Sequence, residues 1–465
     1  MEILDTILNI TDKVLMAVLT IGFLPQVIYI FLCFLKPKAY KSTEIKHHFG
    51  IVVPARNESK VIAETINSLK NLNYPLDKLT IFVIADNCTD NTAEIARGLG
   101  VNVIERFDDT KRTKGFAMNF AFKQIVEDYP QIESFIVFDA DNLVHPDYVL
   151  KMNDAFDTGV ELARGFSNSK NLTDNYISCV WGLYYIRDCR YSCRVRSALN
   201  TDQNMNGSGM MISSSIIKEK GWDCFGLCED AEFTFKRMLE GKRTRYVNDA
   251  VFFEEQPVSM KDTFNRNIRM GHGLNKLFFT QGIPMLGKFF TTFRYGYLDM
   301  FLSLLFMPIA FICCFWFPIF YGYKIALAIV AFGSNPEILY SILKMAAIAL
   351  TCIFYLPFVL QSLLCVALTK NDLKYDKMST LIKASFLFPL FMIIYMLSIT
   401  IGIISRKPQW KAIDHHRAVS TSDFFDMPAN GQAQPDVIEA DNVCACDNVS
   451  NTDDIESNLD ENEDK

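Results

Sequence analysis

Long apolar stretches without charged residues constrain this chain more than any other feature of its sequence. Residues 14–35 contain no charged side chain, and a helix of about 20 such residues crosses the apolar core of a bilayer. Three further apolar stretches follow, at 297–321, 338–368 and 380–404. Residues 36–296 have the mixed polarity of a soluble domain. The pattern predicts one N-terminal transmembrane helix, a soluble domain, and a membrane bundle of three or four spans over 297–404.

The lysines after the first apolar stretch predict the side of the membrane on which the soluble domain lies. They are Lys36, Lys38, Lys41 and Lys46. Because basic residues are retained on the cytoplasmic side, we expect a multi-pass protein of the plasma membrane with a cytoplasmic domain. The stretch is too long for a secretory signal peptide, and no small-residue cleavage site follows it.

The side on which the C-terminal tail lies depends on the number of crossings. Three spans after the domain would place residues Arg406–Lys411 outside the cell, against the preference of basic residues for the cytoplasm. Either residues 297–333 contain two short crossings, or one segment enters and leaves the membrane on the same side. We favour a tail inside the cell.

The remaining boundaries follow from charge and composition. Residues 1–13 form a short N-terminus. Residues 276–296 are apolar but carry basic side chains, which predicts a helix in the membrane interface, with a buried connecting helix as the alternative. Residues 405–420 form a juxtamembrane segment around Trp410. Residues 421–465 hold thirteen acidic residues and one lysine, which predicts a disordered tail.

Strand and helix patterns alternate within the soluble domain. The predicted strands are 50–54, 79–85, 101–104 and 134–138, and the predicted helices are 57–71, 90–99 and 115–129. This alternation predicts an α/β domain with a mostly parallel sheet. Ligands of such sheets bind beyond the carboxyl ends of the strands. Polar residues follow three of these ends: Glu58, then Asp86 and Asn87, then Asp139 and Asp141.

The two carboxylates that follow the strand at 134–138 can serve one cation. In an extended segment, residues two apart point the same way, so Asp139 and Asp141 can converge. Mg²⁺ or a similar divalent ion such as Mn²⁺ takes one or two protein carboxylates together with phosphate oxygens of a substrate. The alternative is a capped turn, in which Asp139 or Asn142 bonds nearby backbone N–H groups.

Four segments, "VVPARNES", "VIADNCTDNT", "TKGFAMNFAF" and "FDADN", occur in an order and spacing that resemble family 2 glycosyltransferases. The likeness is strongest to membrane-embedded members that make polysaccharides or glycolipids, and it covers residues 48–275 with the flanking spans. It implies a GT-A fold, a Rossmann-like and mostly parallel sheet, in the cytosolic domain. It also implies a nucleotide-sugar donor, expected to be UDP-linked, and a Mg²⁺ or Mn²⁺ ion held by Asp139 and Asp141.

The resemblance also implies which residues hold the donor. They are Glu58, Asp86, Asn87, Lys114, Gly115 and Asp139. Glu58 and Asp86 match positions that bind the base and the ribose, and a carboxylate accepts strong bonds from such groups. Asp86 has an alternative role as a helix cap. Lys114 has an alternative role as a solvated surface charge, in which case Arg112 could replace it.

Two later motifs match the acceptor side of the same family. In "CED", Asp230 matches the general base and Glu229 precedes it; the alternative is that both acids complement the dipole of a helix. In "FNRNIRMGHG", Arg269 matches a cation that offsets charge on the leaving diphosphate, and Arg266 lies on the same helical face. Met270 stands where processive relatives have Trp. Met lacks the flat ring on which an acceptor sugar can stack, which argues against processive synthesis. Arg269 is alternatively a surface charge, and Trp410 either gates the site or anchors the chain in the interface.

These observations predict an inverting glycosyltransferase that moves a sugar from a nucleotide-diphosphate sugar to a glycan or lipid-linked acceptor at the membrane. No nucleic acid is expected as a partner. The alternative is a membrane transporter or channel with a nucleotide-sugar-sensing cytosolic domain. The scarcity of ionisable residues in the predicted spans disfavours that alternative.

Overall fold

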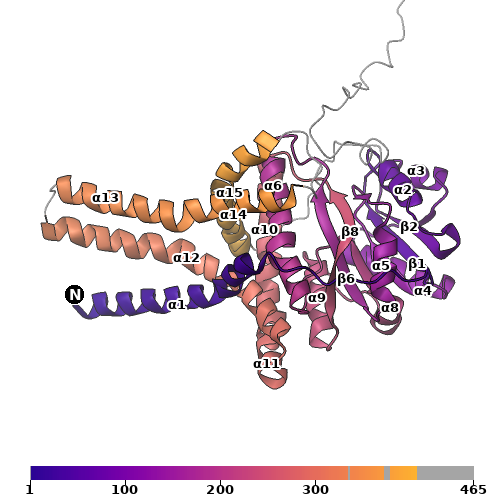
Figure 1. Cartoon of the computed structure of the whole chain (residues 1–465), viewed down its shortest axis with the longest axis horizontal. Helices are drawn as coiled ribbons and strands as arrows, with labels where there is room; N and C mark the ends of the chain where they lie inside the picture. Colours follow the sequence, from indigo (N-terminus) through magenta and orange to yellow (C-terminus); the bar gives the residue numbers. More distant parts are fainter. Residues whose placement is uncertain (1, 333–335, 371–377, 406–465) are drawn as a thin grey trace, which may run out of the picture. The chain divides into compact units, whose positions relative to one another are not determined.

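The computed structural model describes residues 2–332, 336–370 and 378–405, which Figure 1 shows as ribbons. The expected Trp segment at 405–420 lies outside the described residues apart from Ser405. The expected acidic tail at 421–465 lies outside them entirely.

The soluble domain is built on one mixed sheet of eight strands in the order β3-β2-β1-β4-β7-β6-β8-β5. The strands are β1 Phe49–Ala55, β2 Leu79–Asp86, β3 Asn102–Arg106, β4 Ser134–Val137, β5 Leu143–Val144, β6 Leu162–Ser169, β7 Met210–Ser213 and β8 Thr244–Glu254. β1, β2, β3 and β4 are mutually parallel, whereas β7 is antiparallel to both of its neighbours. The four predicted strands are therefore confirmed with small shifts of their ends.

Alternating side chains of β1 enter two different cores, because successive residues of a strand point to opposite faces. Ile51 and Val53 pack with buried residues of α2 Ile62–Lys70, α3 Thr92–Gly98 and α5 Tyr148–Phe156. Val52 packs with α4 Lys114–Asp128, α8 Ser214–Lys220 and α9 Glu229–Leu239. Helices thus cover both faces of the sheet, as a central strand that is apolar throughout requires.

The helix expected at 57–71 begins later than predicted, at Ile62. Asn57, at the start of the predicted range, lies outside the helix and does not cap it. It adopts a left-handed backbone with φ of 57°, and its Oδ1 accepts from Thr89 N at 2.8 Å. A short polar side chain tolerates this conformation because it bonds locally, so Asn57 joins the loops that follow β1 and β2.

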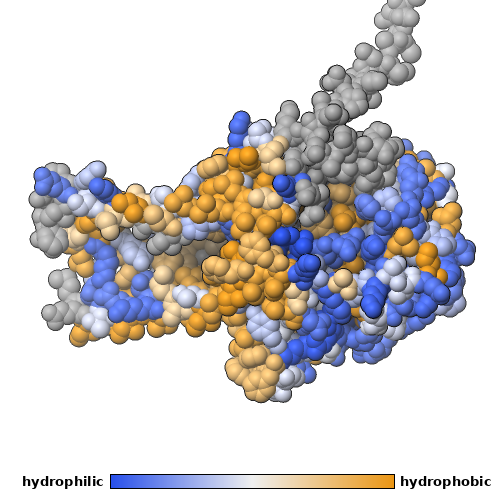
Figure 2. All heavy atoms as spheres, viewed as in Figure 1, coloured by the Kyte–Doolittle hydropathy of each residue, from blue (hydrophilic) through white to orange (hydrophobic). Residues whose placement is uncertain are grey.

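The remaining helices belong to the apolar part of the chain and its junction with the sheet. They are α1 Glu2–Leu32, α6 Tyr176–Arg187, α7 Arg194–Ala198, α10 Met260–Leu277, α11 Ile283–Thr292, α12 Tyr295–Phe332, α13 Pro336–Leu350, α14 Leu356–Thr369 and α15 Met378–Ile404. By length and composition, Ile3–Leu32, Phe311–Val330 and Met378–Ile404 are candidate membrane spans among the described residues. Apolar surface gathers over this part, whereas the sheet domain is mostly hydrophilic (Figure 2).

Two boundaries differ from the sequence-based expectation. α1 starts at Glu2, so the short N-terminus predicted for residues 1–13 is helical from Glu2 onward. α12 is one continuous helix over Tyr295–Phe332. A continuous helix cannot reverse its direction, so residues 297–333 do not hold two crossings. The predicted interfacial segment 276–296 is divided between the end of α10, a π-helical turn η3 at Phe278–Gly282, and α11.

A buried carboxylate ties α1 to the rest of the chain. Asp299 of α12 accepts from Tyr29 of α1 at 2.8 Å and from Arg196 Nε of α7 at 2.7 Å. All three side chains are more than nine-tenths buried. Breaking such a buried pair leaves an uncompensated charge, so this contact fixes three distant segments together.

α15 packs against α6 and α10, two helices at the junction of the apolar part with the sheet. Near its start, the Thr380 carbonyl accepts from Cys179 Sγ of α6 at 4.0 Å. Just beyond its end, the Ser405 carbonyl lies 3.0 Å from His272 Nδ1 of α10. Both ends of α15 therefore meet helices that follow strands of the same sheet.

Close contact between α10 and α15 depends on glycine. A Cβ at Gly271 would lie 2.5 Å from the Ile399 carbonyl oxygen, and a Cβ at Gly402 would collide with the Ile268 carbonyl. Between them, Asn267 Nδ2 donates to Ser398 Oγ at 2.9 Å. The two backbones can approach this closely only where no side chain intervenes.

We predict that Gly402→Ala forces α10 and α15 apart and lowers stability by about 1–3 kcal/mol, the usual range for overpacking. The matched control is Gly287→Ala in α11, where a Cβ meets nothing within 4 Å. That change should be neutral or stabilising, because alanine favours helix over glycine by up to about 1 kcal/mol. Thermal unfolding of both variants in detergent checks the prediction, and equal midpoints would contradict it.

Candidate functional site

The motif residues meet at Lys114, the first residue of α4. Its Nζ donates to Asp139 Oδ1 at 2.5 Å and to the Gly207 carbonyl at 3.0 Å. Asp139 follows β4 and Gly207 precedes β7, so one ammonium group joins the ends of two neighbouring strands to a helix start. The solvated-charge alternative for Lys114 is therefore wrong, and Arg112 instead pairs with Asp109 on the surface.

The acceptor motif adjoins this junction. Asp230 lies in the first turn of α9, and a Cβ at Gly207 would lie 3.2 Å from its Oδ2. Burial alone would lower the pKa of Lys114, but the charges of Asp139, Glu229 and Asp230 outweigh burial and raise it. The structure thus brings four predicted residues, Lys114, Asp139, Glu229 and Asp230, into one electrostatic cluster.

Glu229 and Asp230 are held in an environment that disfavours charge. Burial raises the pKa of Glu229, and the neighbouring charge of Asp230 raises it further, against the opposing effects of Lys114 and Arg269. Burial also raises the pKa of Asp230, although backbone N–H groups and Lys114 act in the other direction. A carboxylate with a raised pKa is a better proton acceptor once ionised.

The turn after β4 is stabilised by Asn142 rather than by the two aspartates. Asp139 N donates to Asn142 Oδ1 at 3.0 Å and to Ser208 Oγ at 3.2 Å. The carboxylate of Asp139 is left facing Lys114, and 45% of its side chain is exposed. Asp141 is buried, and its Oδ2 accepts from Glu255 N at 3.2 Å. The capping role predicted as the alternative thus falls to Asn142.

Glu254 is a site residue that the sequence analysis missed. Burial raises its pKa to about 7, the charges of Asp139 and Asp141 add to the rise, and Arg266 opposes it. Glu254 ends β8, so it obeys the strand-exit rule that found the other acids. The strands predicted from the sequence end at residue 138, well before β8. The strand-exit rule was therefore not applied to Glu254.

The carboxylates offer a partial cation site. No group of three or more His, Cys, Asp or Glu residues arranged to hold a metal occurs among residues 2–332, 336–370 and 378–405. Asp139 and Asp141, the predicted metal ligands, could supply two carboxylates, and Glu254 lies near enough to interact with the charges of both. Such a set fits a hard divalent ion whose other ligands come from a phosphate and water.

Arg266 and Arg269 approach the cluster from α10. Arg266 Nη2 donates to the Tyr185 hydroxyl, and its guanidinium lies 4.8 Å from the ring centre of Trp181. Arg269 acts electrostatically on Glu229 and Cys228 at the start of α9. Its Nε has no hydrogen-bond partner among the described residues. Trp181 and Tyr185 were also missed, because α6 is apolar on every side and shows no helical period.

Other predicted donor residues are engaged by the protein itself. Asp86 Oδ1 accepts from Arg106 Nη1 at 2.5 Å, and both side chains are buried. Asn87 Oδ1 accepts from Asp108 N at 2.8 Å. These bonds hold the loop after β3 against the end of β2. The helix-cap alternative for Asp86 is wrong, because Asp90 bonds Thr92 N at the start of α3.

Glu58 and Gly115 lie at either side of the same sheet edge. Glu58 N donates to Thr92 Oγ1 at 2.9 Å, which joins the exit of β1 to α3. A Cβ at Gly115 would collide with the Cys224 carbonyl. The close approach that Gly115 permits is therefore that of the segment preceding α9, and it sets the distance between Lys114 and Asp230.

Comparison with known proteins gives a consistent result. Residues 47–273 match the model of glycosyltransferase-like family 2. Poly-β-1,6-N-acetyl-D-glucosamine synthase of Staphylococcus aureus is 25% identical over 245 residues, 51% of this chain and 55% of that protein. β-Monoglucosyldiacylglycerol synthase of a Nostoc species is 27% identical over 220 residues, 44% of this chain and 45% of that protein. The chain thus spans about half the length of these curated relatives.

The fold also has a counterpart among solved structures. The mannosyltransferase PcManGT from Pyrobaculum calidifontis, in complex with GDP-Man and Mn²⁺, has a TM-score of 0.50 and 17% identity. The match covers 77% of this chain and 98% of that one. At this identity the likeness concerns the fold alone, and it confirms the predicted GT-A arrangement.

The raised pKa of Glu254 predicts a pH-dependent contribution to stability. Its pKa rises from 4.5 to about 7 on folding, so its contribution is fully present below pH 4.5 and is lost as pH rises through about 7. Glu254→Gln should abolish this loss, so the variant should gain thermal stability relative to wild type between those two values. Thermal midpoints measured from pH 4 to 8 test this. Glu94→Gln, on the exposed side of α3, is the control, and parallel curves for all three proteins would contradict the prediction.

Proposed function

Because residues 47–273 form a family 2 glycosyltransferase domain, we propose that this chain transfers a sugar from a nucleotide-diphosphate sugar, expected to be UDP-linked, to an acceptor at the membrane. The observation that carries the proposal is the meeting of two carboxylate motifs at one lysine. Lys114 donates a hydrogen bond to Asp139, and the negative charges of Glu229 and Asp230 help to raise the pKa of Lys114. A transfer between two bound substrates requires the residues that bind the donor to lie next to the residues that bind the acceptor.

The proposed reaction is a single displacement. The acceptor hydroxyl oxygen bonds to the anomeric carbon, the bond from that carbon to the diphosphate oxygen breaks, and Asp230 takes the hydroxyl proton. The configuration at the anomeric carbon inverts, so an α-linked donor gives a β-linked product. The burial that raises the pKa of Asp230 supports its role as the base. Arg269 is proposed to offset charge on the leaving diphosphate.

Asp139 and Asp141 are the residues proposed to hold Mg²⁺ or Mn²⁺. When bound, the ion supplies positive charge that neutralises the diphosphate oxygens. Asp139 already bonds Lys114 through Oδ1, so Lys114 and a cation would share this carboxylate. Asp141 is oriented by the backbone of Glu255, which fixes it at the end of β8 beside Glu254.

The proposed acceptor is a glycan or a lipid-linked saccharide. The two relatives described above are named for a glycan product and for a diacylglycerol product, which supports either class. Met270 lacks the flat ring on which a sugar stacks, and the rings of Trp181 and Tyr185 already face Arg266. We favour the addition of one sugar over processive synthesis.

The membrane arrangement proposed is a cytoplasmic domain with α15 lying along it. α15 is long and apolar enough to cross a bilayer, but both of its ends bond helices of the sheet domain. We propose that a segment with such contacts at both ends stays on the side of the membrane that holds the sheet domain. This supports a C-terminal tail inside the cell, with the protein in the plasma membrane.

We predict that Asp230→Asn lowers turnover by about 10²–10⁴-fold, the usual contribution of a general base. Asparagine keeps the shape of the side chain but cannot accept the proton, so donor binding should change little. Release of nucleotide diphosphate from UDP-sugars by purified protein with Mg²⁺ or Mn²⁺ measures the rate. Glu219→Gln, a surface change on α8, is the control. A near-normal rate in Asp230→Asn would remove Asp230 from the proposed role.

The proposed membrane arrangement predicts where a protease site placed after residue 420 is cut. In inside-out vesicles, where the cytoplasmic face is exposed, the tail should be released together with cleavage of the sheet domain. In right-side-out vesicles the site should stay intact. A site placed after Gly322, within α12, serves as the membrane-protected control. Cleavage of the tail only from the external side would show that α15 crosses the membrane.

A further inference from the structure

Helix α11 carries large apolar side chains on an exposed face. Ile283 is 50% exposed and Phe290 is 64% exposed. Because these two residues are seven apart, they lie on the same side of the helix. Phe279, in the preceding turn η3, is 57% exposed as well. Apolar side chains cover the projecting end of α11 in Figure 2. A contiguous exposed surface of this kind usually contacts a partner.

Another face of α11 is packed into the protein. Met285 follows Ile283 by two residues, which places the two side chains on nearly opposite sides of the helix, and Met285 is fully buried. It belongs to one apolar cluster with Phe235 of α9 and Met300 of α12. α11 is therefore attached to the folded chain through one face, and the exposed face points away from α9 in a fixed direction.

Phe293, the residue that follows α11, is unfavourable in water for two reasons. Its backbone is left-handed with φ of 52°, a conformation in which a helix end normally has Gly or Asn rather than a bulky residue. Its side chain is 76% exposed. Arg294 holds the turn in place, because its Nε donates to Asp202 Oδ2 at 2.9 Å and its Nη1 donates to the Gly241 carbonyl at 3.2 Å. Insertion of the ring into an apolar phase would offset this strain.

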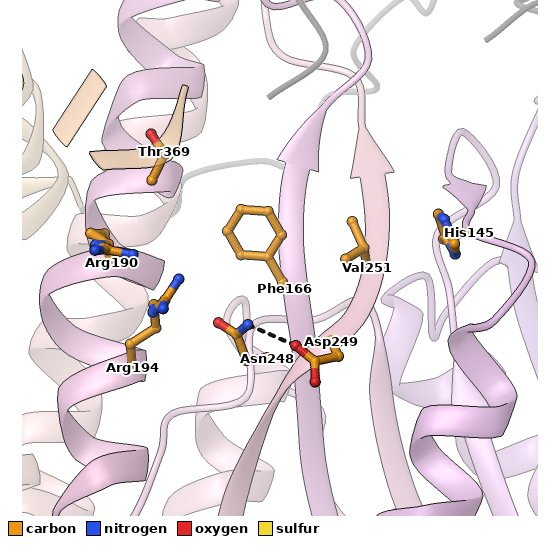
Figure 3. Close-up of a pocket in the computed structure, with 8 residues that line it drawn as sticks. All are labelled: His145, Phe166, Arg190, Arg194, Asn248, Asp249, Val251 and Thr369. Atoms are coloured by element: carbon orange, nitrogen blue, oxygen red, sulfur yellow. Dashed lines mark hydrogen bonds between the residues drawn. The ribbon is translucent and has the colours of Figure 1, made fainter. Parts of the chain in front are cut away.

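The exposed face of α11 is separate from the cavity drawn in Figure 3. That cavity is lined by Phe166 of β6, by Asn248, Asp249 and Val251 of β8, and by residues of other segments, none of which belongs to α11. The partner of α11 is therefore not a small molecule bound in that cavity. An outward-facing apolar surface requires a partner that is itself an extended surface.

The position of α11 along the chain indicates that this surface is a lipid bilayer. α12 begins at Tyr295, two residues after α11 ends, and it contains the candidate membrane span Phe311–Val330. Figure 1 shows α11 running across the direction of α1 and α12. Spanning helices lie within about 40° of the bilayer normal. A helix that crosses their direction therefore lies along the plane of the membrane.

The charge of the segment also suits a bilayer surface. Residues 276–298 contain Lys276, Lys288 and Arg294 but no acidic residue. Lys276 and Lys288 are exposed. A long basic side chain can reach the lipid phosphates while its apolar neighbours enter the acyl chains. Phosphates of anionic lipids attract such side chains further.

We propose that α11 is an in-plane membrane anchor that inserts Ile283, Phe290 and Phe293 into the leaflet nearest the sheet domain. Lys288 then lies among the lipid headgroups. The buried face of α11 packs against α9, the helix that begins with Glu229 and Asp230. Anchoring would thus hold that helix start at a fixed height above the acyl chains. The anchoring goes beyond sugar transfer and does not rest on it.

The test uses full-length protein reconstituted in lipid nanodiscs, with a fluorescent amino acid in place of Phe290. Lipids that carry bromine in the upper part of the acyl chain quench inserted probes, and iodide quenches probes in water. An inserted helix lies about 5–10 Å below the headgroup boundary, so brominated lipid should quench this probe and iodide should quench it severalfold less than an exposed control.

Phe120 provides the matched control, because it is a phenylalanine of α4 in the sheet domain that is 44% exposed. A probe at Phe120 should be quenched by iodide and not by brominated lipid. The proposal is overturned if iodide quenches the probe at Phe290 as strongly as the probe at Phe120. It is equally overturned if neither quencher reaches Phe290, since a protein surface or a second copy of the chain would then cover α11.

Photolabelling of the unmodified protein keeps the test decisive if the probe at Phe290 prevents folding. A lipid with a photoactivatable diazirine high in its acyl chain should label peptides that contain Phe290 and Phe293. Peptides from Phe311–Val330 are the positive control, and those around Phe107, an exposed apolar residue of the sheet domain, should stay unlabelled. Labelled α12 peptides without labelled α11 peptides would overturn the proposal. Neither measurement requires turnover, so a failure of the proposed sugar transfer would leave both results unchanged.

Discussion

The contact between the Lys114 ammonium and the Asp139 carboxylate is the interaction on which the arrangement of the site depends. Lys114 starts α4, and its bonds reach the turn after β4 and the loop before β7. Through Gly207 that loop also touches Asp230. A single cation thus compensates acids contributed by two segments that are distant in sequence. Without it, three carboxylates would face one another across a largely buried space, where like charges repel strongly.

The apolar helices contribute to the site as well as to membrane attachment. α15 holds α10 at backbone contact through Gly271 and Gly402, and α10 carries both Arg266 and Arg269. α6, wedged between α15 and the sheet, supplies the rings that face Arg266. The positions of the Arg266 and Arg269 side chains therefore depend on the packing of α10 against the apolar helix α15.

Much of this architecture follows from the sequence, and the exceptions have physical causes. The strands of the first half and their polar exits are predictable because buried parallel strands read as short apolar runs. Asp139, Lys114 and Asp230 follow from motif order. The pairing of Asp86 with Arg106 could not be predicted, because it depends on the register of β2 against β3. The start of the helix predicted at 57–71 was placed too early, because the left-handed backbone of Asn57 cannot be recognised in the sequence. The contacts of α15 with α6 and α10 could not be predicted, because the apolar composition of a helix does not specify the helices against which it packs.

The Asp299 contact constrains how the chain is made. Tyr29 emerges from the ribosome early, Arg196 much later, and Asp299 later still. The first helix therefore stays without this hydrogen bond until the whole sheet domain has been synthesised. The contact of α1 with α12 therefore forms only in a chain whose sheet domain has already been made. A chain that stops within the sheet domain lacks Asp299, so Tyr29 of its first helix has no carboxylate of α12 to which it can donate.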